Sequence, residues 1–369
     1  MRIDSMEVYL AKMPLLSPWR AGHGDESAIE SVFVKMVSGK LAGWGESSPL
    51  ASPTYSPEWS HGVFLTVSRY LAPILLGKDI RSGRELQALL APVKGNQFAK
   101  AALDQAWWGL HARSRSEPLW KSLGGTTAAV KVGADFGVKD SIQGLLAAVE
   151  GAVKAGYLRV KLKYRPGWAL EMVQAVRAAF PEQVLHVDCN STYTLTDLDM
   201  FRALDGCRLA MIEQPLMHDD LVDHAELQKQ ITTPICLDES IASVAKARKA
   251  IALGSCGWIN IKPGRVGGLT NALEIHDLCM KAGVPCWVGG MLESSLGGHQ
   301  CLALATLPNF PYPADIFPSV TYYKPDLSDP PIELSGVSQV TAPDTPGCGA
   351  APNLDRLQDL CIAKTVISG

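Results

Sequence analysis

Five ionisable residues recur at a nearly constant interval between residues 163 and 262. They are separated by 25, 25, 25 and 24 residues, and each ends a short apolar run: Lys163, Asp188, Glu213, Asp238 and Lys262. A single carboxylate commonly caps a helix or pairs with a lysine, but three that converge repel one another unless a cation lies between them. A ligand set of oxygens without His or Cys favours Mg²⁺, with Mn²⁺ as a substitute. We therefore predict a divalent metal site formed by Asp188, Glu213 and Asp238.

Lys163 and Lys262 lie on the two sides of these carboxylates in the series. A lysine close to a metal cation and to other ammonium groups has a lowered pKa and can act as a base near neutral pH. Two such lysines predict abstraction of a proton next to a carboxylate, with the metal neutralising the enediolate as it forms. The other interpretation is that the lysines only neutralise the acidic cluster, and it applies in part to Lys161.

The apolar runs indicate which elements position these side chains. After about residue 130 the runs alternate with helical stretches, which predicts right-handed β-α-β units and a parallel sheet. Units of about 25 residues match an α/β barrel, whose active sites lie at the carboxyl ends of the strands. The helices that we expect cover residues 167–180, 196–204, 220–230, 241–253, 267–282 and 295–306.

Alternation within the runs supports this barrel. In residues 158–168 (LRVKLKYRPGW) apolar and basic side chains alternate, as they do in a strand. The outward face of a parallel barrel packs against helices, so the polar face must point inward. The inward polar pairs are Lys161 with Lys163, Asp188 with Asn190, and Asn260 with Lys262; Leu158, Val160 and Leu162 face outward, and Arg159 has no evident role.

The first part of the chain has a different character. Residues 3–44 read as antiparallel strands, interrupted by PLLSPWRAGHGDESA, residues 14–28, which we expect to be a mobile loop. Residues 57–115 read as helices, most clearly in QFAKAALDQAWWGLHARSR, where Leu103, Ala106 and Leu110 recur at helical spacing. This part is predicted to be an α+β module.

Composition excludes several classes of function. The 369 residues carry a net charge of −3 without a long run of Lys or Arg, which disfavours nucleic acid or an anionic membrane as a partner and favours a small molecule. All nine cysteines lie between Cys189 and Cys361, and their odd number suits free thiols in a reducing compartment. Neither a signal peptide nor an apolar stretch of about 18 residues is evident. We expect a cytoplasmic protein.

Six motifs together resemble one known family. In chain order they are KLK, DCN, IEQP, LDES, IKPGRVGG and GGMLESSLG. They resemble the muconate-lactonizing subgroup of the enolase superfamily, and within it the family of o-succinylbenzoate synthases and N-succinylamino acid racemases. The resemblance implies a (β/α)₇β barrel of the TIM type with an N-terminal α+β capping domain. It implies a capping domain at residues 1–127, a barrel at 128–317, and a C-terminal segment at 318–369 that returns to the capping domain.

The resemblance also implies roles for the site residues. Lys163 would be the acid/base, Lys161 would support the enediolate, and Lys262 would face Lys163 across the substrate. The ligands of Mg²⁺ would be Asp188, Glu213 and Asp238. Segments 15–27 and 45–57 of the capping domain would close over the substrate and exclude water. The expected substrate contacts are Asn190, Ser294, Ser295, Arg265 and Tyr55.

Two activities of this family share proton abstraction by Lys163. A synthase dehydrates 2-succinyl-6-hydroxy-2,4-cyclohexadiene-1-carboxylate in menaquinone biosynthesis, with Lys262 as a stabilising cation; this is our first hypothesis. In the alternative, an N-succinylamino acid racemase or an enzyme with both activities, Lys163 and Lys262 each serve one face. Arg265 would then tune Lys262, or it forms only a salt bridge at the start of a helix.

Three further expectations complete the interpretation. Ser295 and Gly298 depart from a family pattern that has a glycine and then an arginine, which affects how a succinyl arm would bind. A hypothesis of another class is a non-catalytic barrel that binds a ligand, although no metal ligand or base is missing. The expected partner is a small carboxylate with a succinyl arm, and we also expect a homo-oligomer.

Overall fold

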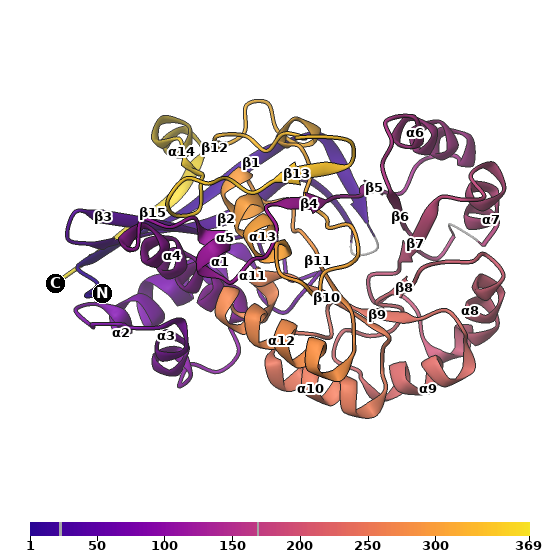
Figure 1. Cartoon of the computed structure of the whole chain (residues 1–369), viewed down its shortest axis with the longest axis horizontal. Coiled ribbons are helices and arrows are strands. Elements are labelled where there is room, and N and C mark those ends of the chain that lie inside the picture. Colours follow the sequence, from indigo (N-terminus) through magenta and orange to yellow (C-terminus); the bar gives the residue numbers. More distant parts are fainter. Residues whose placement is uncertain (22–23, 168–169) are drawn as a thin grey trace.

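The computed structural model describes residues 1–21, 24–167 and 170–369. It consists of a capping part, built on a four-stranded antiparallel sheet, and a barrel of alternating strands and helices (Figure 1). The predicted TIM-type barrel with an α+β cap is therefore confirmed.

The capping sheet is formed from both ends of the chain. Its strand order is β15-β1-β2-β3, so the last strand of the chain pairs with the first (Figure 1). The strands are β1 (Ser5–Ala21), β2 (Gly24–Ser38), β3 (Leu41–Ser47) and β15 (Cys361–Ser368). Helices α1 (Ser60–Thr66), α2 (Ala72–Leu75), α3 (Gly83–Leu90), α4 (Gln97–Ser114) and α5 (Leu119–Ser122) accompany them, with a π-helical turn at Val67–Leu71.

Helix α4 is the central helix of the cap, as its periodicity predicts. Leu103, Ala106 and Leu110 are fully buried, because spacings of three and four residues place them on one helix face. Burial of three such apolar side chains stabilises the packing of α4 by roughly 1.5–3 kcal/mol for each large one.

The prediction of a mobile loop at residues 14–28 is wrong. This stretch forms the distal half of a long hairpin between β1 and β2, apart from residues 22–23, which lie outside the described residues. The register shifts between Pro14 and Trp19, after which pairing resumes and Trp19 lies opposite Glu26. The prolines disrupt only the local ladder, so they did not end the strand pairing.

The hairpin is held in place by the barrel. The backbone N–H of Val138 donates a hydrogen bond of 3.1 Å to the carbonyl of Arg20, and the Arg20 guanidinium lies 2.5 Å from Asp140. The N–H of Leu16 donates to the carbonyl of Tyr322 at 2.9 Å. These contacts explain why an extended hairpin persists so far from the rest of the capping sheet.

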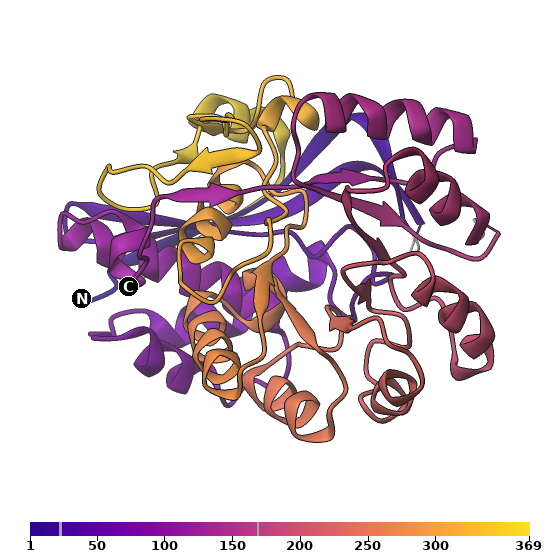
Figure 2. The same ribbon diagram turned by 45° about the vertical axis from the view of Figure 1, so that its right-hand side comes forward.

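Seven parallel strands form the barrel sheet, in the order β11-β10-β9-β8-β7-β6-β5 (Figure 2). They are β5 (Ala134–Phe136), β6 (Arg159–Lys163), β7 (Val184–Asp188), β8 (Ile212–Glu213), β9 (Ile235–Leu237), β10 (Trp258–Ile261) and β11 (Cys286–Val288). Helices cover the outside: α6 (Ile142–Lys154), α7 (Leu170–Ala179), α8 (Leu198–Asp205), α9 (Val222–Gln230), α10 (Val244–Leu253), α11 (Pro263–Val266), α12 (Leu269–Ala282) and α13 (Ser295–Ala305). The six helices predicted from the sequence are present, although the predicted start of the first includes residues 168–169, outside the described part.

An eighth segment, residues 313–316, closes the ring. On one side the N–H of Asp315 donates to the carbonyl of Val288 in β11 at 2.9 Å. On the other side the N–H of Gly133, just before β5, donates to the carbonyl of Ala314 at 3.0 Å. The seven-stranded sheet and this segment together make the (β/α)₇β arrangement.

The alternation predicted for residues 158–168 holds within β6 itself. Val160 and Leu162 are buried against the helices, whereas Leu158 is 47% exposed because it precedes the strand. Leu158 is therefore not a core residue, contrary to prediction.

The remaining elements are short. They are the pairs β4 (Ala129–Lys131) with β13 (Gln339–Thr341) and β12 (Ser328–Asp329) with β14 (Ala351–Pro352), helix α14 (Leu354–Leu360), and 3₁₀ turns at Leu195–Asp197 and Ser319–Thr321. Within the described part of the chain, no helix combines the length and apolar character needed to cross a lipid bilayer.

Candidate active site

The five periodic residues meet at the carboxyl ends of adjacent strands. Lys163, Asp188 and Glu213 are the last residues of β6, β7 and β8, and Asp238 and Lys262 directly follow β9 and β10. Lys163 lies opposite Asp188 in the ladder, and Asp188 lies opposite Glu213. All five side chains are buried. The constant spacing in the sequence thus corresponds to one barrel unit after another.

Lys163 is bound to the acidic edge of the site. Its ammonium donates hydrogen bonds to Asp188 Oδ2 at 2.6 Å and to Asn190 Oδ1 at 3.0 Å. Asn190 adopts a left-handed backbone conformation with φ of 43°, and its Nδ2 donates to Glu239 Oε1 at 3.1 Å. Such a backbone is rare outside glycine and is often found at functional sites. Asn190 therefore lies beside Asp188 and Glu239 at the mouth of the barrel.

Lys262 lies in a second cluster with Tyr55 and Asp238. Its ammonium donates to Asp238 Oδ2 at 2.8 Å and to the Tyr55 hydroxyl at 3.0 Å. The Tyr55 hydroxyl donates to the same Asp238 oxygen at 3.0 Å. Arg265 also donates to the Tyr55 hydroxyl, at 3.1 Å, and forms an ion pair with Asp238. Arg265 therefore forms the salt bridge at the start of a helix that was one of its two interpretations, and through Asp238 and Tyr55 it also joins the cluster of Lys262.

The expectation of a lowered lysine pKa applies to a site that holds a metal cation; in the arrangement described here, burial and direct partners decide the pKa of Lys262. Burial alone would lower it, but Asp238 and Tyr55 raise the pKa of Lys262 well above its usual range. Burial likewise would raise the pKa of Asp238, yet Arg265 and Lys262 hold it below its usual range. The reason is that Lys262 pairs directly with Asp238, one of the three carboxylates predicted to bind the metal.

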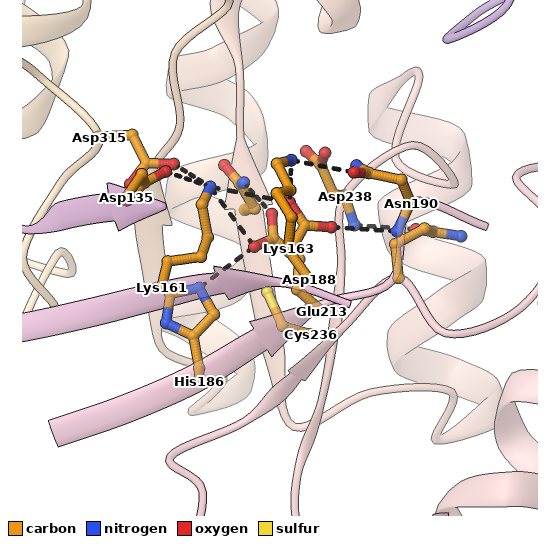
Figure 3. A network of polar contacts seen from close by, with 12 residues as sticks. Asp135, Lys161, Lys163, His186, Asp188, Asn190, Glu213, Cys236, Asp238 and Asp315 are labelled. Atoms are coloured by element: carbon orange, nitrogen blue, oxygen red, sulfur yellow. Dashed lines mark hydrogen bonds and ion pairs between the residues drawn. The ribbon is translucent and has the colours of Figure 1, made fainter. Parts of the chain in front are cut away.

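Lys161 and Arg159 share two aspartates that the sequence analysis missed. Lys161 Nζ lies 2.8 Å from Asp135 Oδ2 and also donates to Asp315, and Arg159 forms ion pairs with both aspartates. Figure 3 shows Lys161 between this aspartate pair and Glu213. Burial would lower the pKa of Lys161, but Asp135 and Asp315 raise it well above its usual range. Lys161 is thus a fixed cation, and Arg159 has a role in holding its counterions.

A signal for Asp135 was available in the sequence. It lies in the apolar run VGADFG, one barrel unit before Lys163, and it is the ladder partner of Lys161 in β5 and β6. Asp315 could not be found this way, because it belongs to the closing segment, which no helical or strand periodicity marks.

Glu213 is a buried carboxylate under electrostatic strain. Burial and repulsion by Asp188 raise the pKa of Glu213 to about 8, although Lys161 opposes this shift. Asn260 Nδ2 donates to Glu213 Oε1 at 2.7 Å, and His186 Nε2 lies 3.3 Å from Oε2 (Figure 3). A buried carboxylate repelled by a neighbouring carboxylate is the environment that a bound cation relieves.

The described residues contain no group of three or more His, Cys, Asp or Glu side chains arranged to hold a metal ion as they stand. The lysines explain this arrangement, since Lys163 and Lys262 occupy oxygens of Asp188 and Asp238. Asp188, Glu213 and Asp238 nevertheless fit a hard cation, because all three offer carboxylate oxygens at the ends of adjacent strands. The raised pKa of Glu213 is a further sign that a positive charge would be stabilised there. A further carboxylate oxygen next to the set, Glu239 Oε2, is buried without a hydrogen-bond partner.

A small cavity of about 50 Å³ lies over these residues. It has room for only a few water molecules, so a substrate enters only if the segments around it move apart. The cap contributes Trp19, Glu26, Ile29, Leu50 and Tyr55, and the barrel contributes Lys161, Lys163, Asn190 and Lys262 among others. Both capping segments that the resemblance assigns to closure therefore line the cavity.

Ser294 and Ser295 are not among the described residues that line this cavity. Ser294 caps α13, and its hydroxyl donates to Glu46 Oε2 at 2.5 Å, whereas the Ser295 hydroxyl donates to the carbonyl of Pro330 at 2.8 Å. They line a neighbouring cavity of about 30 Å³ together with Gly298. A Cβ atom at Gly298 would lie 2.4 Å from Cδ1 of Ile332, so a larger side chain there would displace the end of that isoleucine.

Gly289, the first glycine of GGMLESSLG, makes room for Lys262. A Cβ atom at Gly289 would lie 2.3 Å from Asn260 Oδ1 and 2.8 Å from Lys262 Cε. Only glycine allows the backbone after β11 to pass so close to these two side chains.

Comparison with known proteins agrees with this architecture. Residues 5–124 match the N-terminal domain of mandelate racemase and muconate lactonizing enzyme, and residues 144–356 match the enolase C-terminal domain-like family. The chain belongs to the enolase superfamily. The two superfamily domains correspond to the cap and the barrel described above.

Two relatives define the family more closely. The chain is 43% identical over 348 residues to an o-succinylbenzoate synthase of Geobacillus kaustophilus, which covers 94% of this chain and 92% of the relative. It is 41% identical to an N-succinylamino acid racemase of Amycolatopsis sp over 100% of both chains. A solved enolase superfamily member from Listeria innocua Clip11262 has a TM-score of 0.95 at 35% identity, covering 100% of this chain and 99% of that one. The family predicted from the motifs is thereby confirmed.

Proposed function

We propose that the protein is a Mg²⁺-dependent o-succinylbenzoate synthase, which dehydrates 2-succinyl-6-hydroxy-2,4-cyclohexadiene-1-carboxylate. The observation that carries this proposal is the placement of Lys163 and Lys262 on one cavity beside three buried carboxylates. The relatives named o-succinylbenzoate synthase support the substrate class.

The protein residues would act as follows. Lys163 removes the proton next to the substrate carboxylate and then returns it to the departing hydroxyl, so a single base on one face serves both steps. Lys161 stays protonated and contributes a fixed positive charge, because its ammonium group forms ion pairs with Asp135 and Asp315. Lys262 stabilises the intermediate as a second fixed cation.

Asp188, Glu213 and Asp238 are the residues that would hold Mg²⁺, or Mn²⁺ in its place. The ion would supply positive charge to the substrate carboxylate and so favour loss of the neighbouring proton. Lys163 and Lys262 would be released from Asp188 and Asp238 at the same time, so that Lys163, as the neutral amine, can act as the base and the Lys262 ammonium can face the substrate.

A second activity, racemisation of N-succinylamino acids, is favoured by a specific observation. Lys163 and Lys262 line the same cavity but belong to β6 and to the end of β10, so each can serve one face of an α-carbon. Arg265 and Tyr55, which contact each other and the Lys262 cluster, would set the protonation of Lys262 in this reaction.

One experiment separates these candidates. The protein with Mg²⁺ is incubated in D₂O with the cyclohexadiene substrate and, separately, with N-succinyl-L-phenylalanine; dehydration is followed by absorbance and exchange by NMR. Fast dehydration without exchange would exclude the racemase, and exchange without dehydration would exclude the synthase.

The variant Lys163→Ala is the control for catalysis by this site. We expect it to lose both activities by at least about 10²-fold, because general-base catalysis contributes that much or more. Unchanged turnover would show that catalysis does not depend on Lys163, whereas absence of both activities in the wild type would favour a barrel that only binds a ligand. A partner with a succinyl arm, a homo-oligomeric state and a cytoplasmic location remain predictions from the sequence.

A further inference from the structure

The hairpin of the cap presents one aromatic and one acidic side chain to the catalytic cavity. Trp19 and Glu26 lie directly opposite each other in the β1–β2 ladder, so their side chains project from the same face, and both line the cavity. The neighbouring pair, Arg20 and Asp25, projects from the other face, where Arg20 lies 2.5 Å from Asp140. Because side chains alternate along each strand, the Arg20 guanidinium points away from the cavity and the Glu26 carboxylate points toward it.

Glu26 differs from the other carboxylates that line this cavity. Asp135 and Asp315 are both paired with Lys161 and Arg159. Glu26, in contrast, makes no side-chain hydrogen bond or ion pair with any residue that the structure describes. It is half-buried, and burial together with repulsion by Glu30 raises its pKa. A carboxylate in this environment gains from a cation placed beside it.

Lys12 of the hairpin attracts Glu26 through its charge but forms no ion pair with it. The Lys12 Nζ lies 3.5 Å from Glu30 Oε1, its partner in the β1–β2 ladder. The cations that line the cavity are the three lysines of the barrel, and each of them is paired with an aspartate of the barrel. Glu26 is thus available to a group that the substrate brings.

Aromatic rings stand next to this carboxylate. Trp19 packs edge-on against Tyr322 at 5.9 Å, and Phe317, which also lines the cavity, packs edge-on against Tyr322 at 5.5 Å. The Trp19 indole is thereby held in one orientation. A carboxylate beside an indole ring is an arrangement that binds ammonium and guanidinium groups, through charge and through cation–π attraction.

We propose that Glu26 and Trp19 bind a positively charged group of the substrate, so that N-succinyl derivatives of basic amino acids are preferred in racemisation. The inference rests on the racemase activity proposed above. The substrate class is an N-succinylamino acid with an ammonium or guanidinium at the end of its side chain. Derivatives of equal length without that charge leave the carboxylate unpaired and desolvated, which weakens their binding.

The test compares three substrates in D₂O with the Mg²⁺-loaded enzyme: N-succinyl-L-lysine, N-succinyl-L-arginine and N-succinyl-L-norleucine. Exchange of the α-hydrogen is followed by NMR at several concentrations. We expect kcat/KM for the two basic substrates to exceed that for norleucine by up to about fivefold, the upper range for a partly exposed ion pair. In Glu26→Gln the ratio should fall to near one, through KM more than kcat.

The matched control is Asp25→Asn, which removes one carboxylate from the same hairpin on its opposite face. It should keep the wild-type substrate ratio, and circular dichroism checks that both variants are folded. Equal rates with basic and neutral substrates in the wild type would overturn this inference and leave the racemase proposal standing. A ratio of basic to neutral kcat/KM that Glu26→Gln leaves unchanged would do the same. Absence of exchange with all three substrates would instead overturn the racemase proposal, and this inference with it.

Discussion

Replacing Arg159 with Met is expected to destabilise the whole barrel. Arg159 is completely buried, forms ion pairs with Asp135 and Asp315, and donates a hydrogen bond of 2.9 Å to the carbonyl of Pro313. Methionine fills similar space but leaves two buried carboxylates with Lys161 as their shared cation. Removal of one partner from a buried ion pair typically costs about 3–5 kcal/mol, because an uncompensated charge remains.

The expected loss can be converted to a shift in melting temperature. Unfolding entropy of about 2.1 cal/mol/K per residue gives about 0.8 kcal/mol per degree for a chain of 369 residues. A loss of about 4 kcal/mol therefore corresponds to a shift of roughly 5 °C, measurable by calorimetry alongside urea denaturation. A second variant, Arg159→Met with Asp135→Asn, should recover part of the loss because it removes one unpaired carboxylate.

Arg202→Met is the matched control for these variants. Its side chain is 51% exposed and its ion pair with Asp199 is 3.6 Å long, so stability should change little. A loss below about 1 kcal/mol in Arg159→Met, or a further loss on adding Asp135→Asn, would refute the role given to this cluster.

Three further predictions concern the site and its support. Lys262→Ala should reduce deuterium exchange from one enantiomer of an N-succinylamino acid by at least about 10²-fold, and dehydration of the cyclohexadiene less, since Lys262 is a base only in racemisation; equal losses in both assays would contradict this. Gly289→Ala should lower turnover by about 10²-fold, because its Cβ would lie 2.8 Å from Lys262 Cε and displace that lysine; unchanged kinetics would contradict the close approach. Burial raises the pKa of Glu46 to about 7 from 4.5, against hydrogen bonds from Ser294. The folded chain therefore binds more protons than the unfolded chain between these values, and stability falls as pH rises from about 4.5 to about 7. Glu46→Gln should make this fall smaller in urea denaturation at a series of pH values, and an identical pH dependence would count against it.

The catalytic series was predictable because it follows from local rules. A barrel repeats one helix and one strand at a nearly constant length, so ionisable residues at the ends of successive strands recur every 25 residues or so. Side-chain alternation then assigned Lys161 and Lys163 to the inward face, and the structure buries both. The family motifs added the capping domain and the return of the C-terminus to it.

Other features depend on contacts between distant parts of the chain. Asp315 meets Lys161 from a closing segment 154 residues away, and Glu46 meets Ser294 across 248 residues. The hairpin around Trp19 looked like a loop because its prolines break local strand patterns, and it is ordered by pairing and by contact with the barrel.

The sequence by itself determined the fold class, the family and the order of lysines and carboxylates around the barrel, because these follow from periodicity and residue type. Only the tertiary structure decided how the charges are shared: Lys161 with two aspartates, Lys262 with Tyr55 and Asp238, and Glu26 facing the cavity unpaired among the described residues. The physical reason is that the pKa and the role of a buried charge depend on the groups placed within a few ångströms of it, and these groups come from strands and loops far apart in the chain.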